Sequence, residues 1–231
     1  MQHEPIVTKH RVPRLIHFIW IGSVIPEQYV RNISGFVKVN PDREIVLWVD
    51  CGCGPIEGVK IRTVDKERLV NREIYERTNN IGVKADLLRM EIILEHGGIY
   101  SDVDAVALRR FSTIFDSPFL AYEPHKWKDI TNGIFGFPKN DLFLNGCVNN
   151  LKEHIRWVVS ERRDLLSPTG DNVSCLCGGL YIMSQLFRWR NLDELAFISQ
   201  DYLVTDTGCG FSMHTMDATW IESLQSVSSL L

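Results

Sequence analysis

Residues 85–104 read ADLLRMEIILEHGGIYSDVD, and this stretch predicts a helix, a glycine stop and an acidic strand in succession. Apolar residues cover most of the circumference between Val83 and His96, which is typical of a helix buried inside a domain. The double glycine that follows predicts the end of this helix, because glycine adopts the left-handed conformation of a helix C-terminus without steric cost. Residues 99–106 then predict a strand that carries aspartates.

The sequence on both sides of this stretch predicts strands that alternate with helices. In chain order we expect a strand at 14–22, a helix at 28–39, a strand at 44–50, a loop at 51–58 and helices at 66–78 and 145–160. His17 lies among strand residues and is interpreted as structural. Such alternation is typical of an α/β domain with a largely parallel sheet. No repeat or linker interrupts the pattern, so a single domain is expected over 1–231.

Composition limits the classes of function. The 231 residues carry a net charge of −4, with 45% hydrophobic and 23% charged residues. This balance excludes general disorder, and the slight acidity argues against a nucleic-acid partner, whose phosphates require a basic surface. The apolar runs are shorter than the ~20 residues of a membrane-spanning helix, so no membrane span is expected. The polar N-terminus lacks the apolar core of a signal peptide, which predicts a cytoplasmic protein.

The six cysteines include two close pairs, Cys51 with Cys53 and Cys175 with Cys177. A single intervening residue is tighter than the spacing of about two to four residues that is usual between zinc ligands, which disfavours a zinc site. Without an export signal, reduced thiols are expected rather than a disulfide scaffold.

Asp102 and Asp104 form the first candidate site. Residues two apart on a strand project from the same face, so the two carboxylates are expected to converge. Adjacent carboxylates repel each other, and a divalent cation relieves both this repulsion and the cost of burial. Oxygen ligands of this kind suit Mg²⁺ or Mn²⁺, which accept further ligands from substrate phosphates. The alternative is a strand end whose two solvated aspartates form a turn.

Asp86 and Arg89 form the second candidate site, because they lie three apart on one face of the predicted buried helix. Charged residues in a buried helix are usually paired or functional. The planar fork of arginine binds two oxygens of a phosphate or carboxylate at once. The alternative is an internal salt bridge between the two residues.

The combination of helix, double glycine and acidic strand resembles the signature of the glycosyltransferases with a DXD-containing sugar-binding region, family 32. This family is related to the yeast initiating α-1,6-mannosyltransferase and to the glucosyltransferase domains of large clostridial toxins. Other segments similar to its motifs are VPRLIHFIWIG at 12–22, TNGIFGFPKNDLFL at 131–144, SPTGD at 167–171 and MHTMDATW at 213–220. The last three depart from the family pattern, with Asn140-Asp141 in place of His-Pro, Asp171 in place of Pro and Thr219 in place of Ser.

The resemblance implies the GT-A nucleotide-diphospho-sugar transferase fold, an α/β fold with a largely parallel central sheet flanked by helices. Residues of about 12–110 would form the nucleotide and donor half, and residues of about 111–231 the acceptor half with a C-terminal closing segment. The implied reaction is a metal-dependent, retaining transfer of a hexose from a nucleotide sugar to a glycan or other hydroxyl acceptor, with Mn²⁺ or Mg²⁺ as cofactor. FIWIG at 18–22 is closest to the toxin-like branch, which favours a UDP-sugar over a GDP-sugar.

The resemblance also gives each matching residue a role. Trp20 would stack on the nucleotide base, and Asp86 and Arg89 would hold hydroxyls of the donor sugar. Asp104 would bind the metal directly, and Asp102 would contact ribose or sugar and share the metal through water. The other implied substrate contacts are Ile19, Ile21, Gly22, Ala85, Tyr100, Asn132, Thr219 and Trp220, and His214 is a further implied metal-side contact. The implied catalytic set is Asp86, Arg89, Asp102 and Asp104.

Two other classes of function use the same residues. A sugar-nucleotide hydrolase or nucleotidyltransferase would need the same metal and diphosphate, although the sequence lacks a glycine-rich loop with a following lysine that holds a triphosphate. A catalytically inactive sugar-nucleotide-binding module would have little need for four charged residues together. No nucleophilic carboxylate is assigned for a double displacement, which favours front-face substitution.

Overall fold

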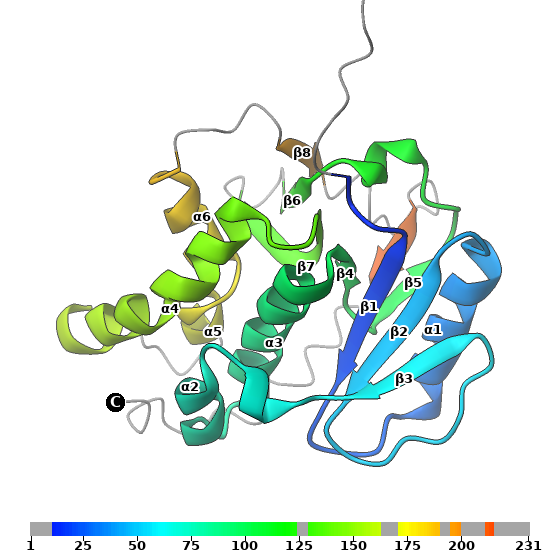
Figure 1. The fold of residues 1–231 in the computed structure, drawn as a ribbon, viewed down its shortest axis with the longest axis horizontal. Coiled ribbons are helices and arrows are strands. Elements are labelled where there is room, and N and C mark those ends of the chain that lie inside the picture. The colour runs from blue at the N-terminus through cyan, green and yellow to red at the C-terminus, as the bar shows by residue number, and fades with distance from the viewer. Residues whose placement is uncertain (1–10, 124–128, 163–170, 190–194, 200–210, 215–231) are drawn as a thin grey trace, which may run out of the picture.

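A seven-stranded sheet in the order β3-β2-β1-β4-β7-β6-β8 runs through the centre of the computed structural model (Figure 1). The structure describes residues 11–123, 129–162, 171–189, 195–199 and 211–214. The strands of the sheet are β1 (Leu15–Trp20), β2 (Glu44–Val49), β3 (Val59–Thr63), β4 (Gly98–Ser101), β6 (Phe119–Glu123), β7 (Asp129–Phe137) and β8 (Ala196–Ser199). Two further strands, β5 (Ala105–Ala107) and β9 (Ser212–His214), form a separate antiparallel pair. The helices are α1 (Glu27–Val39), α2 (Arg72–Arg77), α3 (Ile81–His96), α4 (Leu142–Glu161), α5 (Asp171–Leu176) and α6 (Gly179–Leu186).

Most neighbouring strands of the sheet run parallel. β2 lies between β1 and β3, and β1 also pairs with β4, all in the same direction. β7 is antiparallel to both β4 and β6, and β8 is parallel to β6. A mostly parallel sheet covered by helices confirms the predicted α/β class.

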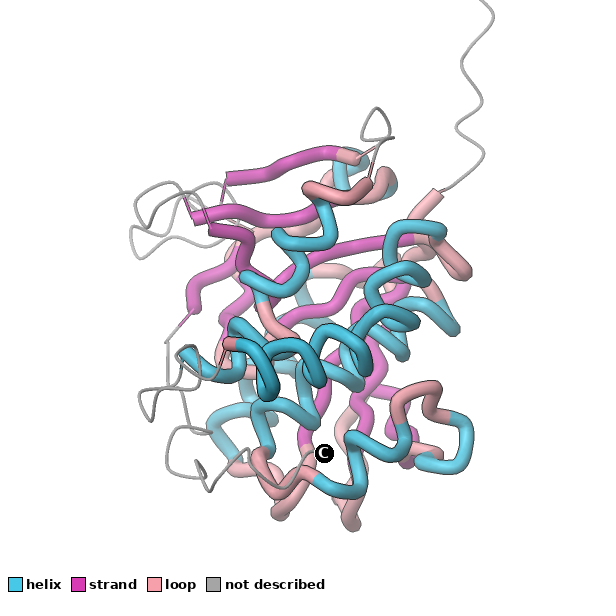
Figure 2. Tube along the Cα trace, turned by 90° about the vertical axis from the view of Figure 1, so that its left-hand side faces the viewer, coloured by secondary structure: helices cyan, strands magenta, loops and turns pink. Residues whose placement is uncertain are grey.

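The two faces of the sheet bury different apolar clusters, because successive side chains of a strand point to opposite faces. Ile16 and Phe18 of β1 pack on the face covered by α1. Ile19 of β1 and Trp48 of β2 pack on the other face, which α3, α4, α5 and α6 cover. Figure 2 views the molecule from the side on which α4 lies, with helices in front of the strands. The helices on both faces make the sheet the middle layer of the domain.

α3 confirms the predicted buried helix and begins two residues earlier than expected. The Asn80 side chain caps it by accepting a hydrogen bond from the Val83 N–H at 3.1 Å. Gly97 ends it with φ +67°, and a Cβ at this position would lie 2.6 Å from the Lys139 backbone nitrogen. Only glycine fits both the conformation and the close approach, which confirms the predicted glycine stop.

The strand expected over 99–106 is interrupted. β4 ends at Ser101 and β5 begins at Ala105, because the chain turns between them, with the Ala105 N–H bonded to the Asp102 carbonyl at 3.2 Å. Asp102 and Asp104 therefore lie in a turn, and the prediction that they share one face of a strand is wrong. The alternative of two aspartates in a turn at the strand end is confirmed as to the turn, but it is wrong as to solvation of Asp104, which is only 9% exposed.

The helix expected over 66–78 consists of a 3₁₀ turn (Lys66–Arg68) and the separate helix α2. The Glu91 carboxylate of α3 accepts hydrogen bonds from the backbone N–H groups of Val70 and Asn71 at 2.7 and 2.9 Å. These bonds hold the chain in a non-helical path between the two pieces. β3 was not expected, because its charged side chains suit an exposed edge strand rather than a buried apolar run. None of the helices in the described ranges is long and apolar enough to cross a membrane.

His17 of β1 is 1% exposed and has a hydrogen-bond partner at each ring nitrogen. The Trp48 indole N–H donates to Nδ1 at 3.0 Å, so the proton of the neutral ring lies on Nε2, which donates to the Gly97 carbonyl at 2.9 Å. Burial lowers the pKa of His17 to about 3, although the bond to the Gly97 carbonyl acts in the opposite direction. His17 thus links β1, β2 and the end of α3, as expected of a structural residue.

We expect His17 to make the stability of the protein depend on pH. Its ordinary pKa is 6.5 and its folded pKa is about 3, so the unfolded state binds more protons between these values. The contribution of the neutral His17 ring to stability is therefore complete above pH 6.5 and is lost as the pH falls toward 3. Between pH 7 and pH 5 the loss corresponds to about 2 kcal/mol of unfolding free energy.

The measurement is urea denaturation of the wild type and of His17→Gln at both pH values. The other titrating groups are common to the two proteins, so the excess stability of the wild type should shrink by about 2 kcal/mol from pH 7 to pH 5. An excess that does not change with pH would contradict this role of His17.

Candidate active site

The turn at 102–104 lies at the carboxyl end of β4, beside β1. Open α/β sheets bind ligands at the carboxyl ends of their strands. Three elements bring the predicted residues together here: α3 supplies Asp86 and Arg89, the end of β4 supplies Tyr100 and Asp102, and β7 supplies Asn132. Three of the four predicted charged residues, Asp86, Arg89 and Asp102, therefore meet in one place.

Arg89 lies at the centre of this site and is 7% exposed. Its Nη2 atom lies 3.0 Å from Asp86 Oδ1 and 3.4 Å from Asp102 Oδ1. Its Nη1 atom donates to the Asn132 carbonyl oxygen at 2.7 Å, and the guanidinium lies over the Tyr100 ring, 4.5 Å from the ring centre. One buried cation thus joins α3, β4 and β7.

The charges at this site perturb one another's pKa. Burial raises the pKa of Asp86, although the positive charge of Arg89 opposes the rise. Burial lowers the pKa of Arg89, but Asp102 and Asp86 more than offset it, so the guanidinium stays charged with a pKa above its ordinary value. Burial also raises the pKa of Tyr100, whose hydroxyl keeps its proton and donates to Asp102 Oδ1 at 2.6 Å. Asp102 Oδ1 is therefore bonded to Tyr100 and faces Arg89.

Gly133 leaves the space that the other oxygen of Asp102 occupies. The Asp102 N–H donates to the Gly133 carbonyl at 2.8 Å, which ties the turn to β7. A Cβ at residue 133 would lie 2.8 Å from Asp102 Oδ2. This glycine is not among the site residues predicted from the sequence, although it directly follows Asn132, which is.

Asp86 Oδ2 is enclosed by the junction of α5 and α6. The Cys177 thiol lies 3.7 Å from this oxygen, and a Cβ at Gly178 would lie 2.9 Å from it. Neither residue is among the site residues predicted from the sequence. Their separation from Asp86 along the chain gave no local pattern by which to find them.

The turn itself is held by α1 as well as by β7. The Asn32 side-chain amide donates to the Val103 carbonyl at 3.0 Å. Asp104 lies at the end of the turn, next to β5. β9 pairs with β5 so that His214 lies opposite Ala105, which brings the backbone of His214 close to Asp104. Thr219 and Trp220 lie outside the described residues.

Trp20 lies at the carboxyl end of β1, where the sequence analysis expects the nucleotide base. Its indole N–H donates to the Ser23 carbonyl at 3.0 Å, and its ring packs 5.0 Å from the Tyr29 ring. Gly22 has φ +85°, and its N–H donates to Asp50 Oδ1 at 2.8 Å. Ile19 and Ile21 are both 6% exposed and belong to the apolar core, whereas Ala85 is half-buried on α3.

The donor set fits a divalent cation that is shared with a substrate. No group of three His, Cys, Asp or Glu side chains that would enclose a metal occurs within the described ranges. Asp102 and Asp104 nevertheless supply two carboxylates from one short turn, and Mg²⁺ or Mn²⁺ is commonly held by one or two carboxylates together with substrate phosphates. Asp102 and Asp104 are the residues that would hold such an ion.

Comparison with known proteins gives a family match over the segment that contains most of this site. Residues 26–120 match the family described as "Glycosyltransferase sugar-binding region containing DXD motif". The matched range contains α3, the double glycine and the turn with both aspartates. It confirms the resemblance found in the sequence over that range.

Two curated relatives and one solved structure illustrate the similarity. "Subversion of eukaryotic traffic protein A" of Legionella pneumophila is 26% identical over 125 residues, which are 47% of this chain and 19% of that protein. "Inositol phosphoceramide mannosyltransferase 3" of Schizosaccharomyces pombe is 31% identical over 142 residues, which are 61% of this chain and 37% of that protein. The chain thus spans well under half of the length of these relatives.

The UDP-bound glycosyltransferase domain of the YGT toxin superposes with a TM-score of 0.57 at 9% identity, covering 81% of this chain and 79% of that one. At such low identity the likeness concerns the fold alone. It confirms the predicted GT-A type of fold.

We expect Arg89 to be required for stability, because its removal leaves Asp86 and Asp102 without their compensating charge. Breaking a buried ion pair by removing one partner costs about 3–5 kcal/mol, so Arg89→Met should lower the unfolding free energy by about that amount. Arg72→Met is the matched control, because Arg72 pairs with Glu67 and Glu76 on the exposed surface. Exposed pairs contribute about 0–1 kcal/mol. Equal losses for the two variants in urea denaturation would contradict the role of Arg89.

Proposed function

We propose that this protein is a metal-dependent, retaining glycosyltransferase that moves a hexose from a nucleotide sugar, with a UDP-sugar favoured, to a glycan or other hydroxyl acceptor. One observation carries the proposal. A buried Arg89 is held between Asp86 and Asp102, directly behind an acidic turn in a segment that matches a DXD sugar-binding region.

The charge of the cluster supports a neutral sugar next to it. Asp86 and Asp102 surround the single cation of Arg89, so the ionised cluster has an excess of negative charge. Such a cluster repels a phosphate but accepts the hydroxyl groups of a sugar as hydrogen-bond donors. Asp86 and Arg89 would therefore hold the donor hexose, with Tyr100 behind Asp102 and Asn132 at the edge.

The same charge supports a divalent cation at the diphosphate. A diphosphate next to Asp102 and Asp104 is unfavourable unless a cation lies between them. A bound Mn²⁺ or Mg²⁺ would act as a Lewis acid toward the leaving diphosphate. Asp104 would bind the ion directly, and Asp102 would share it while remaining bonded to Tyr100. His214 would add a contact from β9, on the strand that pairs with β5.

The base would stack on Trp20. This side chain is half-buried at the end of β1 and is fixed by its bond to Ser23 and its contact with Tyr29. Base–aromatic stacking contributes about 1–3 kcal/mol. The UDP-bound structural neighbour supports uracil as the base. The relative named a mannosyltransferase makes mannose one candidate for the hexose.

Retention at the anomeric carbon would follow from front-face substitution. In this reaction the bond from the sugar carbon to the diphosphate breaks, the bond to the acceptor oxygen forms on the same face, and the acceptor proton passes to the leaving phosphate. Double displacement requires a carboxylate free to attack. Asp86 and Asp102 are both engaged by Arg89, which argues against either as the nucleophile.

The acceptor would bind to the half of the domain after residue 110, and the closing segment at 208–220 lies mostly outside the described residues. A sugar-nucleotide hydrolase is the alternative, and an assay of UDP release separates the two. Release that depends on an added hydroxyl acceptor supports transfer, whereas equal release without acceptor supports hydrolysis.

We expect turnover to require both the metal and Asp104. Removing a group that stabilises charge in the transition state costs about 10²–10³-fold in rate. Asp104→Asn should therefore reduce Mn²⁺-dependent UDP release at least about 100-fold. EDTA should abolish release by the wild type, and added Mn²⁺ should restore it. Undiminished release in EDTA would rule out the metal-dependent reaction.

We expect Gly133→Ala to impair the site without unfolding the protein. The added Cβ would displace the carboxylate of Asp102, but Arg89 would keep Asp86 as its partner, so the cost falls mainly on the site rather than on the fold. Mn²⁺-dependent UDP release should fall by about tenfold or more, because an activation free energy that is higher by about 1.4 kcal/mol lowers the rate tenfold.

Gly146→Ala on α4 is the matched control, because a Cβ there meets nothing within 4 Å. This variant should retain wild-type release. Both variants should unfold within about 1 kcal/mol of the wild type, as expected of substitutions without a large steric conflict in the core. If Gly133→Ala turns over as fast as Gly146→Ala, the proposed position of Asp102 is wrong.

A further inference from the structure

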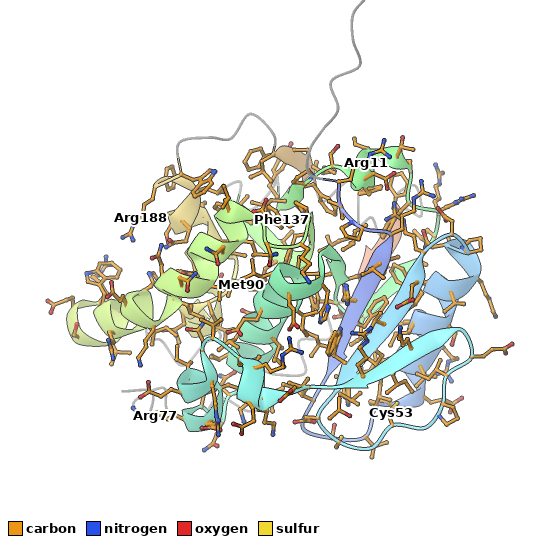
Figure 3. The ribbon with its side chains drawn as sticks, viewed as in Figure 1. Arg11, Cys53, Arg77, Met90, Phe137 and Arg188 are labelled. Carbon is orange, nitrogen blue, oxygen red and sulfur yellow. The ribbon has the colours of Figure 1, made fainter. Side chains whose placement is uncertain are left out.

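Cys51, Gly52 and Cys53 begin the loop that leaves β2, and the function proposed above uses none of them. Both cysteines are free thiols that are half-buried. Figure 3 labels Cys53 near the lower edge of the molecule, in the loop that joins β2 to β3. The pair therefore lies at the carboxyl end of β2, next to the end of β1.

The covalent geometry of this loop permits a disulfide between the two cysteines. Consecutive Cα atoms are about 3.8 Å apart, so the Cα atoms of residues two apart lie about 5–7 Å from each other. Disulfides join residues whose Cα atoms are about 4.4–6.8 Å apart. Residues 52–56 belong to no helix or strand, and Gly52 has open space around it. The two sulfur atoms can thus meet through local rotation of the loop.

The thiol of Cys51 is bonded to the segment that fixes Trp20. Cys51 Sγ donates to the Ser23 carbonyl at 2.9 Å, and the Trp20 indole N–H donates to the same oxygen at 3.0 Å. The neighbouring Asp50 carboxylate accepts the Gly22 N–H at 2.8 Å. The residues at the end of β2 therefore hold the chain directly after Trp20 through two hydrogen bonds.

We propose that Cys51 and Cys53 form a redox modification site, in which a reversible disulfide loosens Trp20 and weakens nucleotide binding. The link to the nucleotide rests on the proposed role of Trp20 in the function above. Formation of the disulfide removes the S–H donor to the Ser23 carbonyl and draws Cys51 toward Cys53. The Ser23 carbonyl then loses one of the two donors that fix its position.

The oxidant is a small-molecule disulfide such as oxidised glutathione. One protein thiolate attacks a sulfur of the oxidant, and a mixed disulfide forms as the first small thiolate leaves. The second protein thiolate attacks the protein sulfur of that mixed disulfide, so the Cys51–Cys53 bond forms and the second small thiolate leaves. The two protons of the protein thiols end on the two released thiols, and the two electrons lost by the protein reduce the oxidant.

The size of the ring makes the modification reversible. A disulfide that closes over a single residue is strained, and strained, accessible disulfides are reduced more readily than structural ones. A dithiol reductant should therefore restore the reduced state. The loss of one hydrogen bond corresponds to nucleotide binding that is weaker by about three- to tenfold.

The experiment treats the full chain with oxidised glutathione and measures three quantities. Tryptic peptide mapping tests whether the peptide 44–60, which contains both cysteines, loses two hydrogen atoms. Nitrogen-15 NMR follows the indole N–H resonance of Trp20, assigned with Trp20→Phe. Calorimetry measures binding of UDP in the presence of Mn²⁺.

Cys51→Ser keeps a hydroxyl donor for the Ser23 carbonyl but cannot form the disulfide. Cys175→Ser is the matched control, because it removes another half-buried thiol and leaves the 51–53 pair intact. In the wild type and in Cys175→Ser we expect the internal disulfide, a shifted Trp20 resonance and about three- to tenfold weaker UDP binding, all reversed by dithiothreitol. Cys51→Ser should show none of these changes.

A peptide 44–60 that keeps both thiols would overturn the inference, as would a disulfide that leaves the Trp20 resonance unmoved. A disulfide that moves Trp20 but leaves UDP affinity unchanged would overturn the link to nucleotide binding. Failure of the reduced protein to bind UDP would instead count against the proposed function. In that case the peptide map and the Trp20 resonance still decide whether the redox site exists.

Discussion

The buried guanidinium of Arg89 is the interaction on which the site depends. A charge that is 7% exposed must be compensated, and Asp86 and Asp102 provide that compensation from α3 and from the end of β4. The bond from Arg89 to the Asn132 carbonyl adds β7 to the same arrangement. The position of one side chain therefore fixes three elements relative to one another. The excess negative charge that results explains why the proposed reaction needs both a neutral sugar and a divalent cation.

Two glycines allow the surrounding backbone to approach these carboxylates. Gly133 on β7 and Gly178 before α6 each lie where a Cβ would come within 3 Å of a carboxylate oxygen, on Asp102 and Asp86 respectively. A larger residue at either position would displace an acid that Arg89 requires. β7 and the α5–α6 junction thus pack closely against the two carboxylates that surround Arg89.

The base end of the proposed donor site is held by a different kind of contact. Trp20 depends on a loop carbonyl, Ser23, that it shares with the thiol of Cys51, and on Asp50, which fixes the adjacent backbone. These are single hydrogen bonds at a partly exposed edge, each contributing about 1 kcal/mol. The charged centre is thus held by several buried contacts, whereas the base end is held by single hydrogen bonds, and the proposed disulfide in the neighbouring loop would remove one of them.

The sequence by itself determined the α/β class, the buried helix α3, the glycine stop and the position of Asp86 and Arg89 on one face of that helix, whereas their ion pair was only one of two alternatives. These features depend on local periodicity and on backbone conformations that glycine adopts most readily, and both are determined by residues that are close together in the sequence. Only the tertiary structure decided that Asp102 and Asp104 lie in a turn rather than on a strand, because the bond from Asp102 to Gly133 that ties the turn to β7 joins residues far apart in the chain. The same holds for Cys177 and Gly178 beside Asp86, and for the Ser23 carbonyl between Trp20 and Cys51. Such contacts are set by how elements pack in space, and no spacing along the sequence encodes them.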